Sequence, residues 1–170
     1  NNIGIIYKGQ GDIPLCLEYY HKGLKIEEEI GNKKGMATSF NNIGVIHNNQ
    51  KDYPLALEYY IKSLKLNEEV GNKKGMALSY NNIGMIYFKQ AESVKKSSEN
   101  QSRDSLFSLT LEYYRKCLKL RMETGDENGK SSCYMNLGGV YNAQGNLELA
   151  LMYFNKSLKI RQKISHKRGE

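Results

Sequence analysis

The stretch "NNIGVIHNNQ", Asn41 to Gln50, decides the fold because it occurs twice more in nearly the same form. "NNIGIIYKGQ" begins at Asn1 and "NNIGMIYFKQ" begins at Asn81, so the copies start 40 residues apart. A related stretch, "MNLGGVY", begins at Met135. A fixed period of this length indicates a repeat architecture, in which each unit is one small supersecondary structure.

The third unit is longer than the others. The interval from Asn81 to Met135 is 54 residues, because the segment 91–104, "AESVKKSSENQSRD", adds 14 residues. This polar segment has no apolar period and is expected to be a long hairpin loop or a helix extension. The expected units form one array over 1–170: 1–32 with a truncated first helix, 33–72, 73–126, 127–166, and the start of a further unit at 167–170.

Each unit has two stretches with helical periodicity. In the first stretch of the second unit, Phe40, Ile43, Gly44 and His47 fall at i, i+3, i+4 and i+7, which is one face of a helix. Glycine costs about 1 kcal/mol relative to alanine in a helix interior, so its recurrence at this place indicates close approach by a neighbouring helix. No segment alternates with period two for long, so no sheet is expected.

The second stretch of each unit has helix-start and helix-end signals. Capping residues precede it, as at Asp52, whose side chain can accept hydrogen bonds from free backbone N–H groups. Proline follows within the first turn, and Gly71 is expected to end the helix. Paired aromatic residues are expected to fill the space between helices; they are Tyr19-Tyr20, Tyr59-Tyr60, Tyr113-Tyr114 and Tyr153-Phe154.

The order of these residues resembles the tetratricopeptide repeat. In the second unit the matching residues are Phe40, Ile43-Gly44, His47, Ala56, Tyr60 and Ser63, and in the fourth they are Tyr134, Leu137-Gly138, Tyr141, Ala150, Phe154 and Ser157. The period of 40 residues resembles the long-helix subclass found in kinesin light chains, spindle-orientation adaptors and bacterial regulators. The resemblance implies an all-α fold, a right-handed α-solenoid of stacked antiparallel helical hairpins.

The repeated asparagines do not fall on the packing face of their helix. On a helical wheel they lie away from Phe40, and the resemblance implies that this face lines the concave groove of the solenoid. In several relatives such asparagines form a ladder that holds the backbone of an extended peptide, since a carboxamide both donates and accepts. The predicted groove residues are Asn2, Asn42, Asn82, Asn136, Asn41, Asn81, Val45, Asn48, Asn49, Met85, Phe88, Lys89, Asn142, Lys34 and Lys74.

Two alternatives remain open for this surface. Asparagines on an inner face can satisfy neighbouring backbone groups, or each other, without any ligand. Lys34 and Lys74 can be solvated linker lysines.

Composition limits the choice of partner and of chemistry. The net charge of +7 favours an acidic partner, but lysines alternate with glutamates, so nucleic-acid binding is not expected. No apolar run reaches the roughly 20 residues of a membrane helix. Three cysteines without short spacing predict reduced, buried thiols and a cytoplasmic protein. No catalytic set, metal-ligand spacing or cofactor motif occurs, so we expect no enzyme, no metal and no cofactor.

The sequence therefore predicts a protein–protein interaction module, a regulatory or scaffolding part of a larger protein, that binds a peptide segment in its groove. Two other functions remain open. The chain can be a self-assembling structural spacer that stacks through its open ends, or the sensor segment of a larger signalling enzyme.

Overall fold

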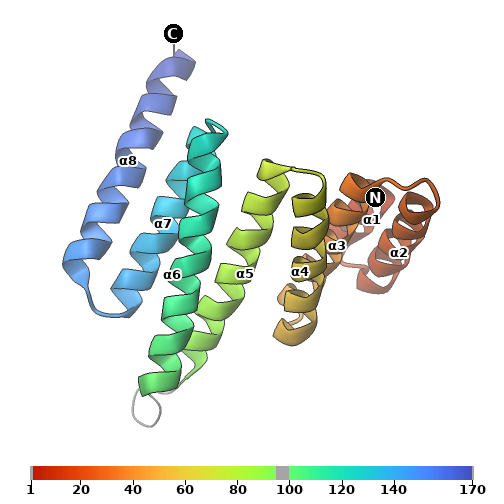
Figure 1. The fold of residues 1–170 in the computed structure, drawn as a ribbon, viewed down its shortest axis with the longest axis horizontal. Coiled ribbons are helices and arrows are strands. Elements are labelled where there is room, and N and C mark those ends of the chain that lie inside the picture. Colours follow the sequence, from red (N-terminus) through yellow and green to blue (C-terminus); the bar gives the residue numbers. More distant parts are fainter. Residues whose placement is uncertain (1, 95–99, 170) are drawn as a thin grey trace. The chain divides into compact units, whose positions relative to one another are not determined.

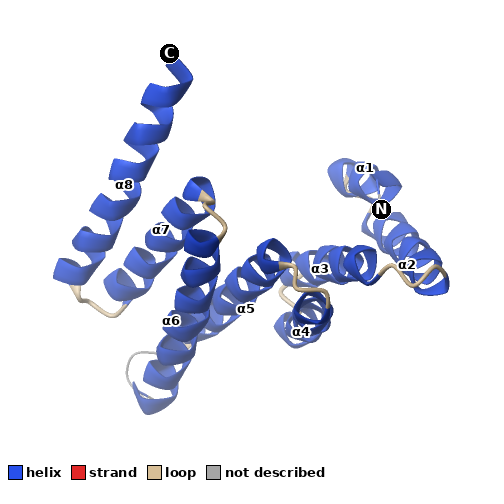
Figure 2. Ribbon diagram, turned by 45° about the horizontal axis from the view of Figure 1, so that its top comes forward, coloured by secondary structure: helices blue, strands red, loops and turns tan. Residues whose placement is uncertain are grey.

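The computed structural model of the protein describes residues 2–94 and 100–169 (Figure 1). These residues form helices joined by short turns, and no strand occurs among them (Figure 2). The helices are α1 (Asn2–Gln10), α2 (Ile13–Glu29), α3 (Lys33–Asn49), α4 (Tyr53–Glu69), α5 (Lys73–Ser93), α6 (Asn100–Glu123), α7 (Glu127–Ala143) and α8 (Leu147–Gly169). We call α1, α3, α5 and α7 the first helices of their hairpins, and α2, α4, α6 and α8 the second helices.

The predicted helix starts are confirmed. The side chain of Asp52 accepts a hydrogen bond from the backbone N–H of Leu55 at 3.3 Å, and Pro54 lies in the first turn of α4. Asn146 caps α8 in the same way, with the N–H of Leu149 at 3.1 Å. These side chains satisfy donors that a helix leaves free at its N-terminus.

The turn between hairpins depends on glycine. Gly31, Gly71 and Gly125 have φ values of +67°, +64° and +65°, a conformation that only glycine adopts without strain. Ser165 stands at the corresponding place in the fourth hairpin, and α8 continues past it to Gly169. Residues 167–169 therefore extend α8, where the sequence analysis expected the start of a further unit, because no glycine is present to end the helix.

The chain forms two compact units, Asn1–Ser79 and Tyr80–Glu170, with their boundary inside α5. We call them the N-terminal unit and the C-terminal unit. A buried cluster of Cys16, Tyr20, Ile43 and Ile46 holds the N-terminal unit together, and α2 there packs on α3. In the C-terminal unit α7 packs on both α6 and α8, and the buried cluster is Ala91, Phe107, Leu111, Tyr114, Leu137 and Val140.

The insertion lengthens both helices of the third hairpin. The helix α5 runs to Ser93 and α6 begins at Asn100, while residues 95–99 lie outside the described residues. Arg103, near the start of α6, links this helix to α5 and α7. Its guanidinium donates to the carbonyl oxygens of Ala91 and Ala143, each at 3.3 Å, and lies 4.9 Å from the ring of Phe107. Ala143 ends α7, so Arg103 satisfies a carbonyl that the helix leaves free.

The mid-helix glycines do allow close contact between the two helices of a hairpin. A Cβ atom added at Gly44 lies 2.7 Å from a ring carbon of Tyr60, and one added at Gly138 lies 2.6 Å from the ring of Phe154. Tyr60 is fully buried, so its ring has no room to retreat. The prediction that the aromatic pairs fill space between helices is confirmed.

The other aromatic residue of each pair stacks on the first helix. The ring centroid of Tyr59 lies 5.6 Å from that of His47, with the planes 4° apart. In the C-terminal unit Tyr153 stacks on Tyr141 at 5.5 Å. His47 therefore replaces the tyrosine of the other hairpins without loss of the stacked geometry.

Candidate peptide-binding face of the first helices

The predicted groove residues all belong to first helices. We call the side of these helices that carries Asn42 and Asn136 the asparagine face. In the N-terminal unit its residues differ widely in exposure. Asn2 and Asn49 are exposed, and Asn42 is half-buried. Asn41 and Asn48 are only 8% and 6% exposed. The first three can therefore reach a ligand, whereas the last two belong to the interior.

The wheel position explains the burial of Asn48. Asn48 lies one turn beyond Gly44, at the edge of the packing face, and not at the centre of the asparagine face. Val45, one residue after Gly44, is half-buried and lies closer to the centre.

In the C-terminal unit the asparagines contact one another. Asn136 on α7 donates from Nδ2 to Oδ1 of Asn81 on α5 at 2.8 Å. Asn81 in turn lies 3.4 Å from Oδ1 of its neighbour Asn82, which is only 6% exposed. Asparagines of successive first helices thus point to the same side of the unit. Asn136 and Asn81 are half-buried, so they keep contact with solvent.

The remaining predicted residues of the C-terminal unit have mixed roles. Phe88 packs against the buried cluster, with its ring centroid 6.2 Å from that of Phe107. It occupies the same repeat position as Asn48, so both lie at the buried edge of the face. Met85 and Lys89 are half-buried, and Asn142 is exposed.

Lys34 and Lys74 both lie on the N-terminal unit. The helices α3 and α5 begin at Lys33 and Lys73, so each of these lysines is within the first turn of its helix. Both are exposed. They add positive charge near the starts of α3 and α5.

The C-terminal unit has hollows along α6 and beside α8, and Met135, which precedes Asn136, lines one of them. One of about 400 Å³ opens beside the exposed side of α8. A second, of about 330 Å³, lies between α7 and the end of α8, and a third, of about 580 Å³, lies along α6. The first is lined by Met135, Phe154, Asn155, Ser157, Leu158 and Arg161, and none of the residues lining the three belongs to the predicted groove set.

The cysteines are buried, as predicted, but two of them lie together, which was not predicted. Sγ of Cys117 on α6 is 2.9 Å from Sγ of Cys133 on α7. The signal was present in the repeat, because Ser63 and Ser79 occupy the same two positions one hairpin earlier. Their hydroxyl oxygens are 3.2 Å apart.

The histidine, cysteine and acidic side chains of the described residues are dispersed. Within residues 2–94 and 100–169, no group of three or more histidine, cysteine or acidic side chains is placed to hold a metal ion. None of the helices in this part of the chain is long and apolar enough to cross a membrane.

Comparison with known families gives a match over most of the chain. The family model described as tetratricopeptide repeat matches residues 35–95 and 106–163. No curated protein matches the sequence.

Several solved structures have the same fold. BtubC (BKLC) from P. vanneervenii is 23% identical, with a TM-score of 0.77 over 96% of this chain and 62% of that protein. The apo form of RapI is 17% identical, with a TM-score of 0.60 over 94% and 66% of the two chains. MamA is 18% identical, with a TM-score of 0.57 over 96% and 97%. The chain thus spans less than two thirds of the length of BtubC and RapI, and these likenesses show an all-α helical repeat solenoid.

Proposed function

Because the chain belongs to the tetratricopeptide repeat family, we propose that it is a protein–protein interaction module whose asparagine face binds an extended peptide segment of a partner. Membership of the family supports an interaction or scaffold role, and the fold is typically non-catalytic. We further propose a regulatory or scaffolding place within a larger protein. The cytoplasmic location, the absence of enzymatic activity and a role as the sensor segment of a signalling enzyme remain predictions.

The observation that carries the proposal is the contact between Asn136 and Asn81. Their 2.8 Å hydrogen bond aligns the carboxamides of two successive first helices on one side of the C-terminal unit. A carboxamide has two N–H donors and a carbonyl oxygen with two lone pairs, so Asn136 and Asn81 keep hydrogen-bonding capacity for a ligand beyond this bond and the one from Asn81 to Asn82. An extended peptide presents alternating N–H and C=O groups. A row of carboxamides can form hydrogen bonds with these groups whatever the side chains of the peptide are.

Charge suggests which peptides bind best. The sequence has 25 basic and 18 acidic residues, and Lys34 and Lys74 are exposed on the N-terminal unit. Lysine ammonium groups on a surface attract acidic ligands and raise the rate of association at low salt. We therefore propose an acidic peptide segment as the preferred partner.

The test is selection of binders from a library of randomised linear peptides, followed by affinity measurement on variants. Asn42→Ala tests the N-terminal unit and Asn136→Ala tests the C-terminal unit. Loss of one hydrogen bond to the peptide is expected to weaken binding about two- to tenfold. Asn155→Ala, an exposed asparagine on a second helix, is the matched control and should leave the affinity unchanged. Equal affinity for all three variants and the parent protein would refute peptide binding on this face.

A second candidate, head-to-tail self-association, is favoured by exposed apolar side chains on α1 and α8. Leu158 on α8 is 52% exposed, whereas Leu24, at the same position on α2, is 8% exposed beneath α3. Ile3 and Ile6 on α1 are 50% and 59% exposed. The equivalent isoleucines of α3 are buried against α2. The α1 helix of a second copy placed on α8 would repeat the packing of α3 on α2.

Sedimentation across a range of concentrations tests this candidate. Self-association predicts an apparent mass that rises with concentration and falls back to the monomer in Leu158→Glu. The control Leu109→Glu changes an exposed leucine on α6 and should associate like the parent chain. A monomer at every concentration would exclude the spacer function.

A further inference from the structure

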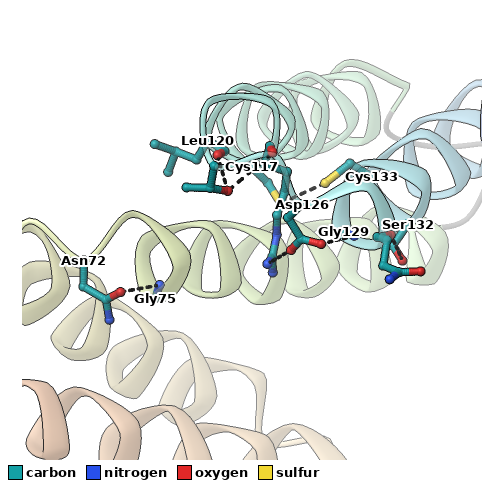
Figure 3. A network of polar contacts seen from close by, with 11 residues as sticks. Asn72, Gly75, Cys117, Leu120, Asp126, Gly129, Ser132 and Cys133 are labelled. Atoms are coloured by element: carbon teal, nitrogen blue, oxygen red, sulfur yellow. Dashed lines mark hydrogen bonds and ion pairs between the residues drawn. The ribbon is translucent and has the colours of Figure 1, made fainter. Parts of the chain in front are cut away.

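We propose that Cys117 and Cys133 are a site of reversible oxidative modification, at which a disulfide links α6 to α7. Both residues belong to the C-terminal unit, and their sulfur atoms are 2.9 Å apart (Figure 3). A disulfide requires side chains that already face each other at short distance, since a distant pair needs backbone movement. Here the two helices hold the thiols in contact before any oxidation.

The contact follows from the repeat, which places a small residue at each of these positions. Ser63 and Ser79 fill them one hairpin earlier, with their hydroxyl oxygens 3.2 Å apart. Packing at this point therefore needs only two small polar groups, and serine meets that need. Two thiols at the same place can be oxidised to a disulfide, whereas two hydroxyls have no such reaction.

The hydrogen bond between the thiols distinguishes the two sulfurs, whereas the charge of Arg121 acts on both. The guanidinium of Arg121 forms an ion pair with Asp126. Asp126 caps α7 by accepting a hydrogen bond from the backbone N–H of Gly129 (Figure 3). The hydrogen bond from Cys133, together with the positive charge of Arg121, lowers the pKa of Cys117. The hydrogen bond to Cys117 and burial raise the pKa of Cys133. Cys117 is thus the thiol that ionises first and attacks an oxidant.

The oxidant class is a hydroperoxide, with hydrogen peroxide as the simplest member. The thiolate of Cys117 attacks one peroxide oxygen, the O–O bond breaks, and a sulfenic acid and hydroxide form. The sulfur of Cys133 then attacks the sulfenic sulfur, the S–S bond forms, and the sulfenic oxygen leaves as water with the thiol proton of Cys133. In total two thiols and one hydrogen peroxide give one disulfide and two waters.

The size of the oxidant matters because both cysteines are only 1% exposed. Hydrogen peroxide is little larger than water and can enter when the contact between α6 and α7 opens locally. Once formed, the bond joins the second helix of one hairpin to the first helix of the next. The disulfide therefore prevents α6 and α7 from separating at this contact.

The experiment uses the full chain with Cys16→Ala, which leaves only the proposed pair. Alanine already occupies this repeat position at Ala56 and Ala150, so the substitution suits the packing. The protein is treated with hydrogen peroxide, alkylated under denaturing conditions and analysed by peptide mass spectrometry. We expect a monomeric product in which the peptides containing Cys117 and Cys133 are linked and its mass is lower by two hydrogens. Treatment with dithiothreitol before alkylation should restore two free thiols, and both are then alkylated.

Two serine variants serve as controls, because serine is the natural residue at both places one hairpin earlier. In the Cys133→Ser variant, oxidation by peroxide should stop at a sulfenic acid on Cys117, which dimedone traps as an adduct. Cys117→Ser should give no linked peptide and little adduct. Two free thiols after peroxide treatment, or linkage only between separate chains, would overturn the proposal.

Discussion

The first helices of the hairpins present two faces, one packed against the second helix and one carrying asparagines. On the packing face the contact repeats almost without change, since a Cβ atom added at the mid-helix glycine lies 2.6 to 2.8 Å from a tyrosine or phenylalanine ring in every hairpin. On the asparagine face the second asparagine of the repeat is exposed at Asn2, half-buried at Asn42 and buried at Asn82.

This difference separates the demands of the fold from those of binding. Close packing tolerates little change in shape, so the packing face repeats the same small and aromatic residues. The asparagine face has no such constraint at its exposed positions. Its residue types and exposures differ from one hairpin to the next.

The largest loss of stability is expected from substitutions where the packing face is fully buried. Ile43→Ala should lower the free energy of unfolding by about 2 to 5 kcal/mol, because it leaves a cavity among Cys16, Tyr20 and Ile46. The same change at Ile3, which is 50% exposed, should cost less than about 0.5 kcal/mol. Urea denaturation followed by circular dichroism measures both, and equal losses would contradict the comparison.

Two adjacent glycines on α7 give the next test. Gly138→Ala should destabilise the protein by about 1 to 3 kcal/mol, because its Cβ would lie 2.6 Å from the ring of Phe154. Gly139 has no atom within 4 Å of an added Cβ, so Gly139→Ala should stabilise the helix by about 1 kcal/mol. Opposite shifts in thermal unfolding are expected, and a stabilising Gly138→Ala would show that the packing face is looser than the structure indicates.

The smallest effect on stability is expected on the asparagine face. Asn136→Ala removes the hydrogen bond to Asn81 and should cost about 0.5 to 1.5 kcal/mol. Asn142→Ala, at an exposed position of the same helix, should change stability by less than about 0.5 kcal/mol. A loss from Asn136→Ala as large as that from Ile43→Ala would mean that the asparagines serve the fold and not a ligand.

The packing face was predictable from the sequence because local spacing determines it. The i, i+3, i+4, i+7 pattern around Gly44, together with the cap at Asp52, fixed the helix pair and its close contact. The burial of Asn82 was not predictable in the same way. It depends on how neighbouring helices cover each position, which a wheel drawn for one helix does not contain.

Two further features required comparison between hairpins. The pairing of Cys117 with Cys133 follows from the serines at the same places, although the spacing of 16 residues matches no familiar cysteine motif. Ser165 replaces a turn glycine, and α8 consequently extends to Gly169. In both cases a residue type changed while the surrounding repeat stayed the same, so the feature emerges only when equivalent positions of the hairpins are compared.

The most direct test of the central claim is a nuclear magnetic resonance titration that observes the asparagine side-chain amides while a library-selected peptide is added. Peptide binding on the asparagine face predicts shifts of the NH₂ resonances of Asn42 or Asn136, with those of Asn155 on α8 unchanged. Shifts confined to α8, with the asparagine face unaffected, would contradict the account and place the interaction surface at the end of the chain.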